Sequence, residues 1–259
     1  MMKTYKGIDI SLYQGNPDFA AVKAAGIDFV MHKAGQGRTP DYDSPFTDPC
    51  FEANVAACAR LAGSTGGGFY SGSYWYLTAR SEAEVRIEAS YYISLLKKYR
   101  YNLQLWAAVD VEDAILTSDK AELTKQVALF CDLIRRAGFR PMVYASSWWI
   151  GNRFDPPAGV PIWEANWSAA SRPDRARMWQ YSSKGAVSGI SGEVDMNVAY
   201  DIMGDANGDG KVDLKDVSAV LRRCAGWNVS INETQADMNQ DGFVTLKDAA
   251  AMIKAVSGK

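Results

Sequence analysis

Histidine is almost absent from this sequence of 259 residues, because His32 is the only one. A Ser-His-Asp or Cys-His mechanism would have to use this residue, and no serine or cysteine near it stands in a nucleophile motif. We therefore expect His32 to be a buried strand residue and set nucleophilic hydrolysis aside. Long apolar runs are missing as well, since none approaches the roughly 20 residues that a membrane-spanning helix needs.

The sequence also has no closely spaced pair of cysteines and almost no net charge. Cys50, Cys58, Cys131 and Cys224 form no C-x-x-C pair and no metal-ligand spacing, so we expect free thiols. The net charge of -2, from 28 basic and 30 acidic residues, excludes the basic footprint of a protein that binds nucleic acid or an anionic membrane. Residues 1–5 lead into a strand without an apolar signal region, so export would need a signal removed from this chain or another route.

Strand-like and helix-like segments alternate along most of the chain. This alternation indicates a parallel sheet, and eight strands with about five helices predict an α/β fold closed into a modified (β/α) barrel. An open, doubly wound sheet is the alternative. The expected strands are residues 5–11, 28–34, 69–77, 103–112, 141–145, 160–167, 177–182 and 193–200, and the expected helices are residues 18–25, 49–61, 81–99 and 118–137, with a short segment at 148–149.

Four acidic residues stand near the ends of expected strands. Asp110 and Glu112 are spaced i, i+2, so their side chains project on the same face, while Asp9 and Asp195 belong to the first and last strands. Because barrel enzymes carry catalytic groups at the carboxyl ends of their strands, we expect all four at one mouth. A helix cap or a solvated strand end explains any one of them, but the set favours an acid pair suited to glycoside hydrolysis.

Segments around these acids carry a family resemblance. They are Gly7-Ile8-Asp9-Ile10-Ser11, Asp110-Val111-Glu112, Trp179-Gln180-Tyr181-Ser182-Ser183 and Val194-Asp195-Met196-Asn197. In this order they resemble glycoside hydrolase family 25, the N-acetylmuramidase lysozymes. The resemblance implies five βα units closed by three further strands. It also implies hydrolysis of β-1,4 bonds between N-acetylmuramic acid and N-acetylglucosamine in peptidoglycan, without a cofactor for catalysis.

The resemblance also implies a role for each acid. Glu112 is expected to be the general acid that protonates the glycosidic oxygen. Asp110 is expected to support the substrate's acetamido group or a water, and Asp9 and Asp195 to hold this pair and tune its protonation. Whether the acetamido oxygen acts as an internal nucleophile stays open.

Aromatic residues near strand ends are candidates for stacking on sugar rings, although large aromatic side chains are as often core residues. Gln180 is a candidate hydrogen-bond donor to an acetamido group. The aromatic candidates for substrate binding are Tyr13, Tyr74, Tyr76, Trp163, Trp167 and Trp179.

The composition changes near residue 204, which predicts a barrel domain over residues 1–203 and a second domain over 204–259. Within the second domain, residues 237–248 repeat residues 205–216, and both fit the oxygen-ligand pattern of an EF-hand calcium loop. An acidic turn that caps a helix is the alternative explanation. The expected ligands of two structural Ca²⁺ ions are Asp205, Asn207, Asp209, Lys211 and Asp216, and then Asp237, Asn239, Asp241, Phe243 and Asp248, with Lys211 and Phe243 offering backbone carbonyls.

The chain between the two loops has room for one helix and a short link, so each copy is a loop-helix half-hand. This tail resembles a type I dockerin, the small all-α module that docks to a cohesin domain of a scaffoldin. A calcium sensor is the rival, but only Met238 and Met252 are available for a Met-rich groove. The resemblance implies a partner face at Leu214, Lys215, Arg222, Leu246, Lys247 and Lys254.

The sequence therefore predicts a secreted muramidase, monomeric apart from its scaffold, with peptidoglycan and a cohesin as partners and with no nucleic-acid partner and no membrane span. Two rivals remain. One is a chitinase-like glycosidase on the same barrel, and the other is an idle carbohydrate-binding barrel, against which the presence of all four acids argues.

Overall fold

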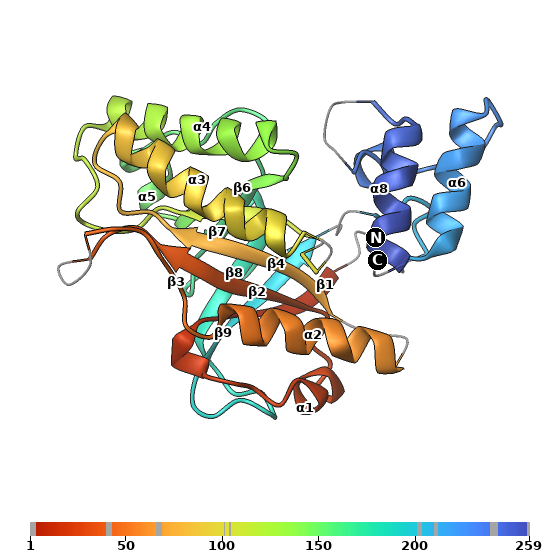
Figure 1. Ribbon diagram of the computed structural model, residues 1–259, viewed down its shortest axis with the longest axis horizontal. Helices are drawn as coiled ribbons and strands as arrows, with labels where there is room; N and C mark the ends of the chain where they lie inside the picture. Colours follow the sequence, from red (N-terminus) through yellow and green to blue (C-terminus); the bar gives the residue numbers. More distant parts are fainter. Residues whose placement is uncertain are drawn as a thin grey trace. The chain divides into compact units, whose positions relative to one another are not determined.

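The structure is a computed structural model that describes residues 4–39, 43–65, 69–100, 102–103, 105–200, 204–209, 212–238 and 243–257 (Figure 1). Contacts between residues divide the chain into two compact units, Lys6–Ala199 and a second that comprises Met1–Tyr5 and Tyr200–Lys259. This division lies a few residues before the boundary that the composition predicts. Among the described helices, none combines the length and the hydrophobicity of a membrane span.

The first unit is a closed barrel of eight strands, as predicted. Parallel pairs run from β2 through β4 to β8, β9 returns antiparallel to β8, and the parallel pairing of β1 with β2 closes the sheet. A short strand that was not predicted, β3 (Phe46–Thr47), pairs antiparallel with β2. The barrel strands are β1 (Thr4–Ile10), β2 (Phe29–Gln36), β4 (Tyr70–Tyr76), β5 (Ala107–Asp110), β6 (Pro141–Ser146), β7 (Ile162–Ala165), β8 (Ala176–Gly185) and β9 (Val194–Tyr200).

In the described part of the first unit, all helices precede β7 in the chain. In Figure 1, α3 and α4 run side by side along one side of the sheet, and α1 and α2 lie on another. The last three strands follow one another without a helix between them, in a stretch of chain that is described throughout. The helices of this unit are α1 (Phe19–Ala24), α2 (Phe51–Thr65), α3 (Glu82–Lys98), α4 (Lys120–Arg136) and α5 (Trp149–Asn152), with a 3-10 turn η1 at Leu12–Gln14.

Side-chain caps begin the two long helices that cover the sheet. Ser81 accepts a hydrogen bond from the backbone N–H of Glu84 in α3, and Asp119 accepts hydrogen bonds from two N–H groups of the first turn of α4. Basic residues occupy the last turn of each helix, at the negative end of its dipole. After α4, Gly138 takes a φ of 82°, which glycine adopts without strain, and the chain turns into β6.

The main core lies between the sheet and helices α3 and α4. Tyr92 of α3 stacks on Trp75 of β4 with ring centroids 5.6 Å apart and packs on Phe130 of α4. Buried Glu88 accepts a hydrogen bond of 2.8 Å from Trp75 Nε1, so this carboxyl group has a donor inside the core. His32 on β2 is buried as predicted, and burial lowers its pKa to about 3.

The second unit is small and helical. Its helices are α6 (Leu214–Cys224), α7 (Glu233–Ala236) and α8 (Leu246–Ser257). Helices α6 and α8 pack on each other through buried side chains that include Val217, Val220 and Met252. Each of these two helices begins at the end of one predicted calcium loop, which confirms two loop-helix repeats. The short helix α7 between them was not predicted.

Replacing Phe130 by alanine removes a fully buried ring from the barrel core. We expect the free energy of unfolding to fall by about 3–5 kcal/mol, because apolar burial is lost and a cavity is left. Urea unfolding followed by tryptophan fluorescence measures the change. The control is Ile87→Ala on α3, whose side chain is 58% exposed and which should cost less than about 1 kcal/mol. Equal losses in the two variants would contradict the placement of the core.

Candidate active site

A pocket of about 440 Å³ opens at the mouth of the barrel, where the parallel strands reach their carboxyl ends. Asp9, Asp110, Glu112 and Asp195 all line it, so the structure brings the four predicted acids together. The rest of its wall is formed by Ser11, Tyr13, Gln14, Lys33, Gln36, Tyr74, Tyr76 and Asp113.

Two of the acids reach the mouth in ways that the strand pattern did not indicate. Strand β5 ends at Asp110, so Glu112 stands in irregular chain just beyond the strand. Asp195 lies at the beginning of β9, and because β9 runs antiparallel to β8, its beginning is level with the carboxyl ends of the other strands. Strands β9 and β1 are neighbours, and the carboxyl groups of Asp195 and Asp9 are hydrogen-bonded.

Asp9 is held by amide donors. Its Oδ2 accepts hydrogen bonds from Gln180 Nε2 (3.0 Å) and Asn197 Nδ2 (2.8 Å). Burial raises the pKa of Asp9 well above its usual range, the charge of Asp195 raises it further, and the two amide donors partly oppose this rise. Burial also raises the pKa of Asp195. A negative charge on one of these two groups therefore disfavours ionisation of the other.

Asp110 and Glu112 form a second acid pair. Burial is the main reason why the pKa of Asp110 lies well above its usual range, and the charge of Glu112 adds to the rise. The pKa of Glu112 is raised by its enclosure in the pocket and by the charge of Asp195. Asp110 Oδ1 is buried and accepts no hydrogen bond from the described residues. Carboxyl groups that keep a proton near neutral pH can act as general acids.

Lys33 is a pocket residue that the strand-end pattern missed. Burial lowers its pKa, and the negative charges of Asp110 and Glu112 oppose that change. Its Nζ donates a hydrogen bond to Gln36 Oε1 (2.8 Å) and lies 4.8 Å from the centre of the Tyr76 ring. Because a lysine in a strand is usually solvated, only knowledge of the closed sheet reveals that this one faces the acids.

The structure places the first four of the predicted sugar-binding aromatic residues in two different environments. Tyr13, Tyr74 and Tyr76 line the pocket, and Tyr13 is 82% exposed. Trp163 is only 1% exposed, and its Nε1 donates a hydrogen bond to Asn197 Oδ1 (2.8 Å). Trp163 is therefore a core residue, and the prediction that its ring faces a sugar is wrong.

Gln180 also differs from its prediction. It is 2% exposed, its Nε2 donates to Asp9, and its Oε1 accepts hydrogen bonds from Trp167 Nε1 (3.0 Å) and Tyr144 Oη (3.1 Å). This amide is engaged at both ends. It therefore holds a pocket acid and, among the described residues, is not part of the pocket wall.

Trp179 precedes Gln180 on β8, so it points to the opposite side of the sheet. Its Nε1 donates a hydrogen bond of 2.8 Å to the backbone carbonyl of Asn166, in the loop after β7. Within the described part of the chain, Trp179 does not belong to the pocket wall. Its observed contact is with this loop, and the prediction that it lines the sugar site is not met.

In the second unit, the last residues of the predicted calcium loops organise the backbone. Asp216 is fully buried and accepts hydrogen bonds from the backbone N–H groups of Asn207 (3.0 Å) and Asp213 (2.8 Å). Asp248, equally buried, accepts hydrogen bonds from the N–H (2.8 Å) and the hydroxyl (3.0 Å) of Thr245. Over the ranges that the structure describes, no group of three or more His, Cys, Asp or Glu side chains is arranged to hold a metal ion.

The other predicted ligands are described only in part. Burial raises the pKa of Asp216, and the charges of Asp205 and Asp209 in the same loop add to the rise. In the first loop Asn207 Oδ1 accepts a hydrogen bond from the N–H of Asp209 (2.7 Å). Asp237 and Phe243 are described in the second loop, whereas Lys211, Asn239 and Asp241 lie outside the described residues.

The predicted partner residues all lie on the surface of the second unit. Leu214 and Leu246 are the first residues of α6 and α8, and both are exposed apolar side chains. Lys215 forms an ion pair with Asp209 across 3.7 Å. The remaining exposed members of the set are Arg222, Lys247 and Lys254.

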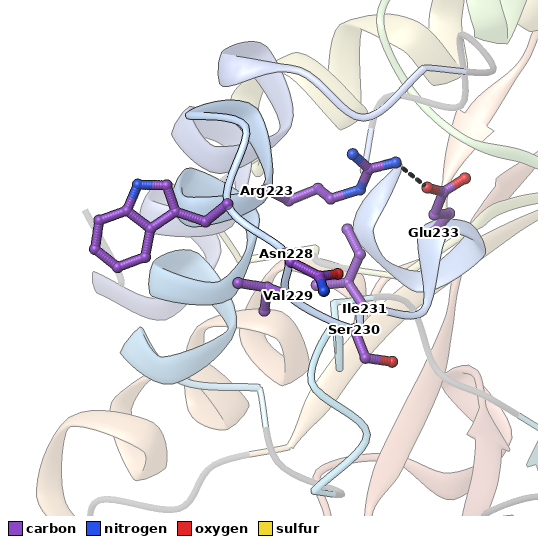
Figure 2. A pocket seen from close by; sticks show the side chains of 7 residues that line it. Arg223, Asn228, Val229, Ser230, Ile231 and Glu233 are labelled. Carbon is purple, nitrogen blue, oxygen red and sulfur yellow. Dashed lines mark hydrogen bonds and ion pairs between the residues drawn. The ribbon is translucent and has the colours of Figure 1, made fainter.

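A pocket of about 360 Å³ lies along the chain between α6 and α7 (Figure 2). Arg223 of α6 and Glu233 of α7 line it and are joined by an ion pair of 2.9 Å. None of the predicted calcium and partner residues that the structure describes lines this pocket. The rest of its wall is Trp227, Asn228, Val229, Ser230 and Ile231.

Replacing Glu112 by glutamine should change the titration of Asp110. Because the charge of Glu112 raises the pKa of Asp110, its removal should shift the Asp110 midpoint to lower pH. The midpoint is measured from the ¹³C chemical shift of the Asp110 carboxyl group as a function of pH. The exposed Glu82→Gln variant on α3 should leave it unchanged. An Asp110 midpoint that stays in place after loss of Glu112 would show that the two groups are not coupled.

Comparisons with known proteins identify the two parts of the chain. Residues 8–190 match the model of glycosyl hydrolases family 25, and residues 203–257 match the model of the dockerin type I domain. The modular autolysin LytC from Streptococcus pneumoniae, solved in complex with a synthetic peptidoglycan ligand, is similar with a TM-score of 0.65 and 25% identity, over 76% of this chain and 47% of that one. A family 25 glycosyl hydrolase structure from Bacillus anthracis has a TM-score of 0.57 at 21% identity, over 76% and 88% of the two chains, and supports the fold.

Two curated relatives are lysozymes. The autolytic lysozyme of Clostridium acetobutylicum is 29% identical over 196 residues, which cover 74% of this chain and 55% of the relative. Lysozyme M1 of Streptomyces globisporus is 26% identical over 221 residues, which cover 74% of this chain and 66% of the relative. The chain thus spans between about half and two thirds of these relatives. Since the first family model matches well over half of its residues, the chain belongs to glycosyl hydrolases family 25 and carries a type I dockerin domain.

Proposed function

We propose that this chain hydrolyses β-1,4 bonds between N-acetylmuramic acid and N-acetylglucosamine in bacterial peptidoglycan. The observation that carries the proposal is the convergence of Asp9, Asp110, Glu112 and Asp195 on one open pocket. Membership of family 25 supports a glycosidase, and the two related lysozymes support a cell-wall substrate.

Glu112 is the proposed general acid. It stands beyond the end of β5, in the open part of the pocket, where a glycosidic oxygen can approach it. Its raised pKa favours the protonated form that a general acid needs before the bond breaks. As the leaving oxygen takes this proton, positive charge develops at the anomeric carbon of the other sugar.

Asp110 is the proposed partner for that positive charge. Its buried carboxyl group at the end of β5 would face the reacting sugar and orient either the acetamido oxygen or an attacking water. Asp9 and Asp195 act on the Asp110–Glu112 pair as positioning residues. The charge of Asp195 raises the pKa of Glu112, and the amide donors to Asp9 affect the ionisation of the neighbouring Asp9.

For the dockerin, we propose that it binds two structural calcium ions and attaches the enzyme to a cohesin domain of a scaffoldin outside the cell. The donor set fits calcium, because Asp205, Asn207, Asp209 and Asp216 bring carboxylate and amide oxygens into one short loop. The exposed leucines and basic residues at the start of the two helices support the partner face. The proposed border between the two modules stays at residues 203–204.

Glu112→Gln should lower kcat on purified peptidoglycan by about 10²–10⁴-fold, because it removes the general acid at nearly constant shape. Release of reducing sugar measures the rate, and Glu82→Gln, an exposed position on α3, serves as the control with unchanged activity. A fully active Glu112→Gln protein would mean that another group supplies the proton. A parent protein that cut only chitin oligomers would be a chitinase-like enzyme, and one that cut neither substrate would be a binding module.

Calcium should bind to two sites in titration calorimetry, and Asp216→Asn and Asp248→Asn should each remove one. At a calcium concentration of about 100 times Kd, each site should stabilise the dockerin by about 2.7 kcal/mol, seen as a higher unfolding temperature that a chelator reverses. Asp174→Asn in the barrel is the control, since this carboxylate is exposed. Unchanged calcium binding in both loop variants would rule out these ligand sets.

A further inference from the structure

Trp167 is an exposed aromatic residue that is tied to the pocket acids. It lies just after β7 and is 60% exposed. Its Nε1 donates a hydrogen bond to Gln180 Oε1 (3.0 Å), and Gln180 Nε2 donates a hydrogen bond to Asp9 Oδ2 (3.0 Å). These three side chains form a continuous hydrogen-bonded chain from the protein surface to a carboxyl group of the pocket.

The direction of this chain is fixed by the chemistry of the amide. Gln180 Oε1 accepts hydrogen bonds from both Trp167 and Tyr144, so two donors converge on the oxygen. An amide whose oxygen faces two donors presents its NH₂ group on the other side, where Asp9 lies. Because Gln180 is buried, water does not compete for these contacts. The indole N–H of Trp167 therefore helps to decide which end of Gln180 faces Asp9.

The loop that carries Trp167 is held in place. Asn166 Oδ1 accepts hydrogen bonds from the backbone N–H groups of Ser168 (3.3 Å) and Ala169 (3.1 Å). The backbone carbonyl of Asn166 is the acceptor for Trp179, as described above. An exposed ring on such a loop is preorganised, so a ligand that packs on it need not order the loop first.

We propose that Trp167 packs on a sugar ring of the glycan next to the cleavage site and, through Gln180, acts as a positioning residue for Asp9. This inference rests on the proposed glycosidase function. The indole face offers the flat apolar surface that the C–H face of a pyranose ring covers, and the indole edge carries the link to Asp9. Glycan binding and the orientation of the Asp9–Asp195 pair are coupled through one side chain.

Two substitutions separate the ring from its N–H group. Trp167→Ala removes both, whereas Trp167→Phe keeps a flat ring and removes the donor. In the Glu112→Gln background, which is expected to cleave substrate about 10²–10⁴-fold more slowly, calorimetry with soluble peptidoglycan fragments should show about five- to tenfold weaker binding for Trp167→Ala and less than a twofold change for Trp167→Phe. The control is Trp227→Ala, an equally exposed tryptophan of the second unit, with unchanged affinity. Unchanged affinity in Trp167→Ala would overturn the stacking.

With Glu112 restored, Trp167→Phe tests the positioning role. Loss of the N–H group loosens Gln180 and weakens its donation to Asp9, so kcat should fall about three- to tenfold at constant KM. Because that donation lowers the pKa of Asp9, the pH profile of kcat/KM should also move to higher pH. A profile and kcat equal to those of the parent would overturn the role. If the Glu112→Gln protein with Trp167 intact bound no fragment, the proposed function would fail as well, whereas binding that does not depend on Trp167 would defeat this inference alone.

Discussion

The pairing of β1 with β2 is the contact on which the whole site depends. In the same strand order without this pairing, β1 and β9 would lie at one edge of the sheet, and β2, β4 and β5 would lie far from them. Asp9 and Asp195 would then be separated from Asp110 and Lys33. Closure joins two acid pairs that are each formed locally, one by neighbouring strands and one by residues close in sequence. The pocket therefore forms because the strand topology brings these side chains together.

Gathering these carboxyl groups has a thermodynamic consequence. A carboxyl group whose pKa is higher in the folded than in the unfolded state stabilises the fold at low pH, and this contribution is lost as the pH rises through the folded-state pKa. Asp9, Asp110, Glu112 and Asp195 all have raised pKa values, so together they weaken the barrel as they ionise. The apolar layer between the sheet and helices α3 and α4 offsets this loss of stability.

Much of the fold could be predicted from the sequence, because the strands and helices of the barrel carry strong local signals. Ser81 and Asp119, for example, mark helix starts by their own hydrogen bonds. The convergence of the four acids was predicted from closure of the barrel, although Asp195 reaches the mouth from the beginning of β9 and Glu112 from the chain beyond β5. The face of the sheet to which a side chain points could not be predicted in the same way. Alternation shows that Trp179 and Gln180 point to opposite sides of β8, but it does not show which of them points into the barrel.

Other features of the site depend on contacts between distant segments. Trp163 and Lys33 have ordinary strand neighbours in the sequence. The contact of Trp163 with Asn197 and the burial of Lys33 beside the pocket acids form only when the sheet closes. The two-residue strand β3 is too short for any periodic signal. The i, i+2 spacing predicted that Glu112 lies at the same mouth of the barrel as Asp110. The pocket contains both residues, although β5 already ends at Asp110.

Strands β7, β8 and β9 are joined by loops, whereas helices form most of the earlier connections of the barrel. Helix-covered strands cannot change their connections without disturbing the packing that stabilises the domain. The connection after β7, which carries Trp167, is anchored instead by hydrogen bonds of Asn166 and Trp179 to backbone groups. The loop after β7 can therefore change in length or sequence, and so change which glycans bind, without disturbing the packing of α3 and α4 on the sheet.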